Sequence, residues 1–278
     1  ITIIVSMIIH PTSIISAYVK LDDEVEIGPY CNIQGHVKIG SGTLVESHVT
    51  IGSRYGIVEI GKNNHIAPGA VIGGPPQDIS YKAEPTKLII GDNNVIREFT
   101  TLNIATSKGS GATVIGNNCY LMAYAHVGHD CKIGNNVIIA NNTNFAGHCH
   151  VEDNVTIGGV CGFTQFTRIG KYAFIASSSV SNKDIIPFSK AQGNWALIRA
   201  TNKVGLLRKG FSKDEVTNIH KAIRIVIMGS DTLEEAYNRI EAECAPSENI
   251  TYLVNFIKNS KRGIAITRDS GRQIDDSI

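Results

Sequence analysis

Ile115-Gly-Asn-Asn-Cys-Tyr-Leu121-Met-Ala-Tyr-Ala-His-Val127-Gly-His-Asp-Cys-Lys-Ile133-Gly-Asn-Asn-Val-Ile-Ile139 lies in the middle of this 278-residue chain, and an aliphatic residue returns there at every sixth position. The same apolar period begins near Ile9 and runs on to Ile175, with interruptions at 52–59, 73–89 and 103–114. A repeat of six matches neither an α-helix, with about 3.6 residues per turn, nor a β-strand, whose side chains alternate with a period of about two. It is typical of a hexapeptide parallel β-helix, in which each short strand is followed by a corner.

A second position of each hexad, four residues after the aliphatic one, holds a small or β-branched side chain. Two inward side chains per hexad, one large and one small, are expected to fill a narrow triangular prism. Cysteine occupies the small position five times, at Cys31, Cys119, Cys131, Cys149 and Cys161. We therefore expect these thiols in the core instead of in disulfides or a metal site, and this cysteine usage favours the cytoplasm.

The extent of the repeat divides the chain into parts. We expect an N-terminal extension (1–8), a mainly β domain that forms the β-helix (9–186) with loops at 73–89 and 103–114, and a C-terminal α-helical domain with its tail (187–278). Loops that leave a regular solenoid often carry function, because the scaffold does not need them.

Two capping-box spacings predict where helices begin in the C-terminal part. These are Ser212 with Glu215, and Asp231 with Glu234. Gly229 lies near the expected end of the first helix. Residues 266–278 are polar and are expected to be frayed.

Charge and hydropathy exclude several classes of function. The formal net charge is +1, which argues against binding of nucleic acid or of a membrane surface. No apolar stretch is long enough to cross a bilayer, so no stable membrane insertion is expected. Residues 183–213 carry seven Lys and Arg side chains against Asp184 alone. This stretch is either a solvated face or a docking site for an acidic partner or a phosphate-bearing ligand.

Four of the nine histidines cluster in the longest run of the repeat, as His126, His129, His148 and His150. His129 takes an outward position and is followed by Asp130, a carboxylate that could orient the imidazole of a general base. Because three hexads make a coil of 18 residues, Asp130 and His148 should be stacked on successive coils. The alternative to a general base is that His129 and Asp130 are ordinary polar residues of a corner. A zinc site from His126, His148 and His150 is a further alternative that the pattern does not favour, so no metal is expected.

Five longer motifs carry a resemblance that runs from about Ile9 to Gly263. They are Gln77-Asp78 with Glu84-Pro85-Thr86, Ala125-His126-Val127-Gly128-His129-Asp130-Cys131, Ala146-Gly147-His148, Ala191-Gln192-Gly193-Asn194, and Gly205-Leu206-Leu207-Arg208-Lys209-Gly210-Phe211-Ser212. With these motifs the chain resembles the UDP-N-acetylglucosamine acyltransferases, which catalyse the first step of lipid A biosynthesis. The last motif separates that family from the short-chain acetyltransferases of the same fold.

The resemblance implies a left-handed β-helix and a homotrimer with active sites between neighbouring prisms. The implied reaction moves a 3-hydroxyacyl chain from the phosphopantetheine of acyl carrier protein to the 3-position of a nucleotide sugar, without a further cofactor. The implied catalytic residues are His129 as base, Asp130 as its support and the Gly147 N–H as oxyanion donor. The implied contacts to sugar, acyl group or nucleotide are Gln77, Asp78, Asn103, His126, His148, Gln165, Asn202 and Arg208, and those to the acyl tail are Met122 and Ser177.

Departures from the family pattern leave the acceptor open. Asn103-Ile104-Ala105-Thr106 stands where the family usually has His-Arg-Gly-Thr, and Thr164 replaces another usual histidine. Ser80 and Val204 replace a lysine and a glutamate that meet the nucleotide in the family. The acceptor could therefore carry a 3-hydroxyl or a 3-amino group. Two alternatives are a coenzyme A-dependent N-acyltransferase acting on another amino-sugar nucleotide, and a non-catalytic scaffold.

Overall fold

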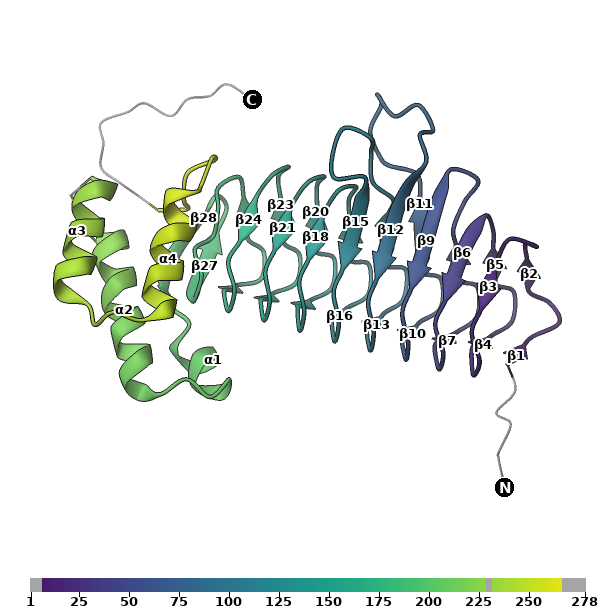
Figure 1. Ribbon diagram of the computed structural model, residues 1–278, viewed down its shortest axis with the longest axis horizontal. Helices are drawn as coiled ribbons and strands as arrows, with labels where there is room; N and C mark the ends of the chain where they lie inside the picture. Colours follow the sequence, from purple (N-terminus) through teal and green to yellow (C-terminus); the bar gives the residue numbers. More distant parts are fainter. Residues whose placement is uncertain (1–6, 229–231, 267–278) are drawn as a thin grey trace.

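The computed structural model describes residues 7–228 and 232–266, and their strands form three sheets around a long triangular prism (Figure 1). Sheet A contains β1 (Ile8–Ile9), β4 (Glu26–Ile27), β7 (Leu44–Val45), β10 (His65–Ile66), β13 (Val95–Ile96), β16 (Tyr120–Leu121), β19 (Ile138–Ile139), β22 (Thr156–Ile157) and β25 (Phe174–Ile175). Sheet B contains β2 (Ile14–Ile15), β5 (Asn32–Ile33), β8 (Thr50–Ile51), β11 (Val71–Gly74), β14 (Thr101–Asn103), β17 (His126–Val127), β20 (Asn144–Phe145), β23 (Gly162–Phe163) and β26 (Val180–Ser181). Sheet C contains β3 (Lys20–Leu21), β6 (His36–Ile39), β9 (Gly56–Ile60), β12 (Thr86–Ile90), β15 (Ala112–Ile115), β18 (Lys132–Ile133), β21 (His150–Val151) and β24 (Arg168–Ile169).

Neighbouring strands within each sheet of the prism are parallel, and away from the loops each residue pairs with the one 18 positions later. Lys132, for example, lies opposite His150, which lies opposite Arg168. The predicted left-handed parallel β-helix is confirmed. We call its edges the A–B, B–C and C–A corners, after the sheets that the chain leaves and enters.

Inward side chains fill the prism as the hexad predicts. The five cysteines of the small position are buried and unpaired, as expected. Each points its thiol at the carbonyl oxygen 15 residues later, as Cys149 does at Thr164 (3.2 Å), so these thiols link successive coils. At the B–C corner Asp130, His148 and Phe166 have φ values of 61°, 62° and 65°, a left-handed conformation that the tight turn requires.

Both predicted loops leave the prism at the B–C corner, but they are shorter than predicted. They span 75–85, between β11 and β12, and 104–111, between β14 and β15. The predicted ends were wrong because the six-residue frame does not mark the longer strands β12 and β15, in which inward residues alternate with a period of two, as Leu88 and Ile90 do. Ile104 of the second loop is fully buried in the core.

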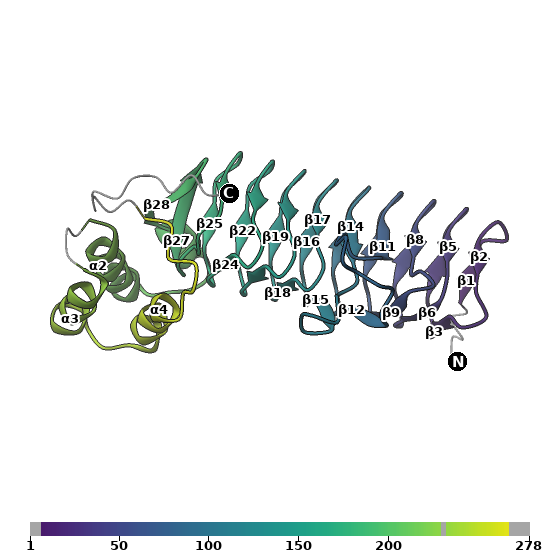
Figure 2. The same ribbon diagram turned by 90° about the horizontal axis from the view of Figure 1, so that it is seen from above.

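The C-terminal part begins with a β-hairpin that the sequence did not predict. Its strands β27 (Ser189–Gly193) and β28 (Ala196–Thr201) extend sheet A, with β27 parallel to β25 and antiparallel to β28. Four helices follow, namely α1 (Lys203–Arg208), α2 (Lys213–Met228), α3 (Leu233–Glu243) and α4 (Glu248–Lys258). Figure 2 shows α2, α3 and α4 gathered at that end of the prism. No helix within the described residues is long and apolar enough to cross a membrane.

One predicted helix start is accurate and the other is one residue off. The Ser212 hydroxyl accepts a hydrogen bond from the Glu215 N–H at the start of α2 (3.1 Å). The second capping box is formed by Thr232 and Glu235, one residue after the predicted pair. The predicted Gly229, Asp231 and the tail beyond residue 266 lie outside the described residues.

Candidate functional site

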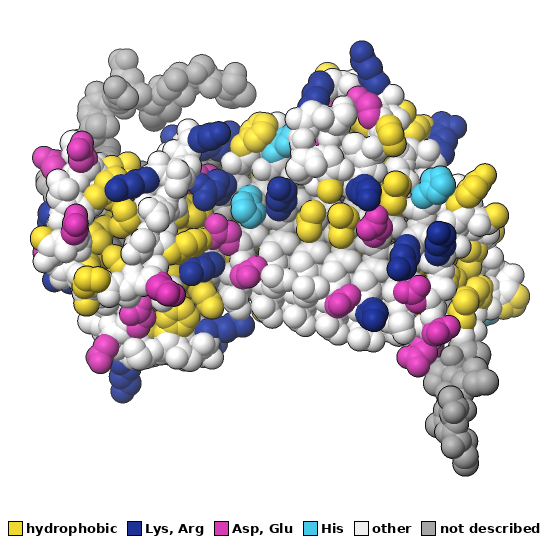
Figure 3. All heavy atoms as spheres, in the orientation of Figure 1, with side chains coloured by type: hydrophobic (Ala, Val, Ile, Leu, Met, Phe, Trp, Pro, Cys, Tyr) yellow, Lys and Arg dark blue, Asp and Glu magenta, His cyan; other side chains and the backbone are white. Residues whose placement is uncertain are grey.

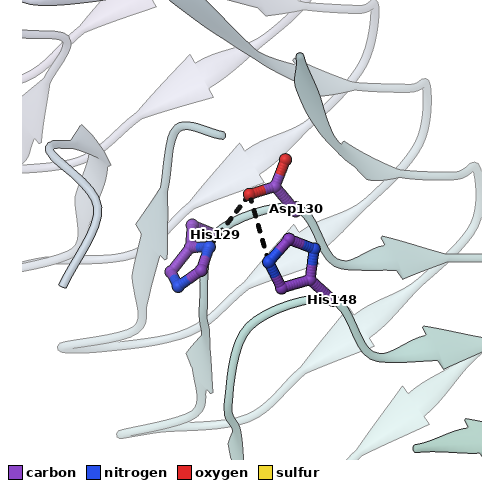
Figure 4. Close-up of side chains that lie close together, drawn as sticks. All are labelled: His129, Asp130 and His148. Carbon is purple, nitrogen blue, oxygen red and sulfur yellow. Dashed lines mark hydrogen bonds and ion pairs between the residues drawn. The ribbon is translucent and has the colours of Figure 1, made fainter. Parts of the chain in front are cut away.

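A side-chain cluster lies at the B–C corner and is formed by His129 and Asp130 of one coil and His148 of the next (Figure 4). His129 Nδ1 lies 2.9 Å from Asp130 Oδ2, and His148 Nε2 lies 3.9 Å from the same oxygen. The His148 N–H also donates to the His129 carbonyl oxygen (2.9 Å), so the backbone fixes the spacing of the two coils. This pairing leaves Nε2 of His129 available to a substrate.

Asp130 is held in place by the second loop, which the sequence did not reveal. Its Oδ2 accepts hydrogen bonds from the Thr106 N–H (3.0 Å) and the Thr106 hydroxyl (2.7 Å), besides that of His129. Burial alone would raise the pKa of Asp130. The hydrogen bonds from His129 and Thr106, with His148 nearby, lower it below its ordinary value instead. Thr106 is the one residue of the family's His-Arg-Gly-Thr pattern that this chain keeps. That match was the sequence signal that could have indicated a role for Thr106 at the site.

The outward positions predicted for His129 and Asp130 do not make them exposed. Each is only 5% exposed. Both side chains lie outside the prism, but the 104–111 loop covers Asp130, and a Cβ added to Gly109 would collide with its carboxylate. The site is therefore a covered one, in which electrostatic interactions are stronger than in water.

Gly147 brings a backbone amide against the His129 ring. A Cβ added at Gly147 would lie 2.6 Å from His129 Nε2, closer than any side chain tolerates. Within the described residues the Gly147 N–H makes no hydrogen bond. An unpaired amide beside the nitrogen of a base can stabilise negative charge that develops on a substrate oxygen.

A pocket of about 460 Å³ opens on sheet B beside this corner. It brings together five residues singled out from the sequence, namely Gln77, His126, His129, Gly147 and Gln165. Asn144 and Thr164 also line it and were not predicted as contacts. Burial, with repulsion from His129, lowers the pKa of His126, whose Nδ1 lies 2.7 Å from the Thr101 hydroxyl.

His148 lies at the edge of the cluster. Its ring stacks on Phe166 (4.6 Å between centroids) and meets His129 edge-on at 5.1 Å. Desolvation lowers the pKa of His148, although Asp130 partly opposes this shift. The imidazole is thus neutral near pH 7 and can donate or accept a hydrogen bond.

Ligand atoms of His129, Asp130 and His148 lie within 4.8 Å of one another, so these residues could approach a metal ion. Asp130 Oδ2 already accepts three hydrogen bonds, however, and the arrangement fits a hydrogen-bond chain better than a coordination sphere. The alternative zinc set is wrong, because His126 belongs to sheet B and His150 to sheet C, on opposite sides of the corner.

The two loops are linked to each other above the site. Lys108 Nζ donates to the Ser80 hydroxyl (2.7 Å), and Ser80 in turn donates to Asp78 Oδ1. Hydrogen bonds from the Ser80 N–H and hydroxyl lower the pKa of Asp78. Asn103 is buried, and its Nδ2 donates to the Pro75 carbonyl oxygen (2.9 Å), which ties the first loop to β14.

Four residues singled out from the sequence lie away from the B–C corner of the same chain. Asn202 caps α1 and donates to the Tyr172 carbonyl oxygen at the C–A corner, and Arg208 ends that helix. Met122 and Ser177 lie at the A–B corner. One chain alone therefore does not bring them into the pocket around His129.

Known families match most of this architecture. A bacterial transferase hexapeptide (six repeats) model matches residues 18–53 and 112–147, and a model for domain 2 of UDP-N-acetylglucosamine O-acyltransferase matches residues 184–265. Two relatives are named acyl-[acyl-carrier-protein]–UDP-N-acetylglucosamine O-acyltransferase. The one from Thermodesulfovibrio yellowstonii is 48% identical over 256 residues, and the one from Janthinobacterium sp. (strain Marseille) is 44% identical over 261 residues. Each match covers 92% of this chain and 98% of the relative.

Solved structures agree with the sequence relatives. The UDP-N-acetylglucosamine acyltransferase of Francisella novicida superimposes with a TM-score of 0.89 at 35% identity, over 94% of this chain and 95% of that one. The one from Campylobacter jejuni gives a TM-score of 0.86 at 40% identity, over 94% and 100% of the two chains.

The lowered pKa of Asp130 predicts how stability depends on pH. Since the folded-state value lies below the unfolded value of about 3.9, the ionised carboxylate stabilises the fold above that pH, and this contribution is lost as the pH falls through the folded pKa. We expect Asp130→Asn to lower the free energy of unfolding by about 1–3 kcal/mol at pH 7 and by less at pH 3. Urea unfolding at both pH values measures this. The control Asp23→Asn, at an exposed corner, should change neither. An equal deficit at both pH values would contradict the prediction.

Proposed function

The chain belongs to the acyl-[acyl-carrier-protein]–UDP-N-acetylglucosamine O-acyltransferase family, and from this premise we propose that it transfers a 3-hydroxyacyl chain from acyl carrier protein to the 3-position of UDP-N-acetylglucosamine, in the first step of lipid A biosynthesis. The observation that carries this assignment to particular residues is the His129–Asp130 pair beside the free Gly147 amide. The coenzyme A-dependent alternative has no such support, because the relatives are named for the carrier protein.

The geometry supports a single-displacement transfer with His129 as the general base. Nε2 takes the proton from the acceptor's 3-hydroxyl as its oxygen attacks the thioester carbonyl carbon. Negative charge moves to the carbonyl oxygen, which the Gly147 N–H meets. The C–S bond then breaks, the ester remains on the sugar, and the imidazolium returns its proton to the leaving sulfur. Asp130 holds the ring in position and stabilises the imidazolium.

An acyl carrier protein donor and a nucleotide-sugar acceptor follow from the family's name, and no cofactor beyond the donor's own phosphopantetheine is part of this mechanism. The cytoplasmic location stays a prediction that rests on six unpaired cysteines.

A homotrimer supplies what one chain's pocket lacks. Met122 and Ser177 lie at the A–B corner, and Asn202 and Arg208 lie at the two ends of α1, so a neighbouring copy could present them to the pocket around His129. The A–B corner also carries a row of exposed apolar side chains, formed by Tyr30, Phe99, Tyr124 and Val160. Exposed apolar rows on a stable solenoid are typical of contact surfaces.

Weakening this row should release single chains. We expect the double substitution Phe99→Glu and Tyr124→Glu to shift the mass in light scattering from about three chains toward one chain of 30.0 kDa, because charges would be buried at the contact. Met228→Glu, an exposed apolar side chain at the end of α2, is the control and should leave the mass unchanged. A wild-type mass of one chain would contradict the proposed trimer.

The roles of His129 and Gly147 predict two distinct losses of activity. His129→Ala removes the base and should lower kcat by about 10²–10⁴-fold. Gly147→Ala keeps the N–H, but its methyl group displaces the His129 ring, so kcat should fall about 10²-fold. Steady-state kinetics measures both, with thermal unfolding to confirm that the variants fold, and exposed His10→Ala is the control. Turnover of His129→Ala within a few-fold of wild type would exclude this base.

A 3-amino acceptor is the second candidate substrate. The buried Asn103 Oδ1 has no hydrogen-bond partner within the described residues, which leaves an acceptor near the first loop. Ile104 does not contribute to this choice, since it lies in the core. An amine is also a better nucleophile than a hydroxyl and relies less on polar helpers.

Comparing the two acceptors with one acyl carrier protein decides between them. If the amine is the natural acceptor, its kcat/KM should exceed that of the hydroxyl sugar, and Asn103→Ala should reduce this preference because the amide oxygen is removed. A clear preference for the hydroxyl sugar in the wild type would eliminate the amine.

A further inference from the structure

A second pocket, of about 380 Å³, lies on the other side of the same corner, on sheet C. Its walls come from β21, β24, the corner itself and the segment after α4. They are formed by His148, His150, Phe166, Arg168, Asp184, Asn259, Lys261 and Arg262. Figure 3 shows Lys, Arg and His side chains gathered on this face where the prism meets the helical domain. We call this the sheet C pocket.

The sheet C pocket has an excess of positive charge that its own acid does not neutralise. Asp184 is buried, its Oδ1 accepts the backbone N–H of Arg168 (2.9 Å), and its Oδ2 accepts the Ser260 hydroxyl (2.7 Å). In residues 7–228 and 232–266, Arg168, Lys261 and Arg262 make no ion pair with a carboxylate. Asp184 therefore has a structural role, and the cations are left for an external anion.

Both guanidinium groups are held in place before any ligand arrives. Arg168 Nη1 donates to the Asn259 carbonyl oxygen (3.1 Å), and its guanidinium lies 4.2 Å from the centre of the Phe256 ring. Arg262 Nε donates to the Asn182 carbonyl oxygen (2.9 Å). These contacts use part of each planar set of five donors, and fixed guanidinium groups of this kind suit phosphate oxygens.

The strand register places a third basic side chain, Lys132, in line with two that form the pocket wall. Lys132, His150 and Arg168 lie directly opposite one another on β18, β21 and β24. Desolvation lowers the pKa of His150, and repulsion from Arg168 and Lys132 lowers it further. The positive potential of Lys132 and Arg168 on either side of this imidazole favours a bound anion.

From this geometry we propose that the sheet C pocket binds the phosphodiester of the donor's 4′-phosphopantetheine arm. The inference rests on the proposed function, since it needs a donor with that arm. The pocket adjoins the catalytic one, because His148 and Phe166 form the corner between them and Arg262 Nη2 reaches the hydroxyl of Thr164 (3.3 Å), which lines the catalytic pocket.

Tether length separates the two possible sources of phosphate. The diphosphate of the nucleotide sugar is attached to the anomeric carbon, two carbons from the 3-position, so it stays beside His129 on sheet B. The phosphodiester of the donor is separated from the thioester by the whole pantetheine chain, which is long and flexible enough to pass round the corner. Phe166, which is half exposed at the turn, offers an apolar surface to that chain.

Donors with and without the phosphate test the assignment. The assay compares 3-hydroxyacyl-phosphopantetheine with 3-hydroxyacyl-pantetheine, using the full-length enzyme, with the KM for UDP-N-acetylglucosamine measured in parallel. The variants are Arg168→Gln and Lys261→Gln, and Lys20→Gln on β3 of the same sheet is the matched control. Lys261 makes no hydrogen bond or ion pair with the described residues, so its substitution leaves the fold intact even if loss of Arg168 loosens α4.

We expect the wild type to prefer the phosphorylated donor and each pocket variant to lower kcat/KM for that donor about three- to tenfold. Activity with the dephosphorylated donor and the KM for the nucleotide sugar should not change, and Lys20→Gln should change none of these values. Equal use of both donors by the wild type, or equal loss with both in the variants, overturns the assignment. A raised KM for the nucleotide sugar places the nucleotide in the pocket instead. Absence of transfer from every donor would contradict the proposed function itself.

Discussion

Backbone pairing between successive coils is the constraint on which the rest of the structure depends. Each short strand bonds to the strand of the next coil, so every residue of the regular prism has a neighbour 18 positions along the chain. That spacing brings the His148 N–H to the His129 carbonyl oxygen and puts Asp130 within reach of both imidazoles. The arrangement proposed to be catalytic is thus a property of the coil repeat, and the position of each histidine is set by the strands of the prism.

The six-residue repeat predicts those features of the structure that follow from its period. It predicted the prism, the burial of the five cysteines and the pairing of His129 with Asp130, because these follow from which side of a short strand a residue occupies. It did not predict the cover over Asp130, because Thr106 lies on a loop with no period. The hairpin β27–β28 was missed for a related reason, since Ser189–Thr201 lacks the alternating apolar pattern of an exposed hairpin.

Basic residues that are close together in the sequence are not the ones that lie close together in the fold. The sequence leaves open whether the basic stretch 183–213 is a solvated face or one docking site, and its Lys and Arg side chains are spread from Lys183, after β26, over the hairpin, α1 and the start of α2. The basic side chains that do gather in one place come from separate parts of the chain, with His150 and Arg168 on the prism and Lys261 and Arg262 after α4. Only folding shows that these segments share a pocket, because more than 90 residues separate Arg168 from Arg262.

The fixed height of a coil limits how the distance between the two pockets' corner and the helical domain can change. An inserted 18-residue coil after β24 would move the helical domain by about 4.8 Å along the prism without altering the pairing of His129 with Asp130. The contact of Arg262 with Asn182, which follows β24, would move with the helical domain, whereas its contact with Thr164, which precedes β24, would be lost. The distance between the His129–Asp130 pair and the C-terminal domain can therefore change only by whole coils. A partner that contacts both the pair and the C-terminal domain must therefore fit a separation that is set by the number of coils between them.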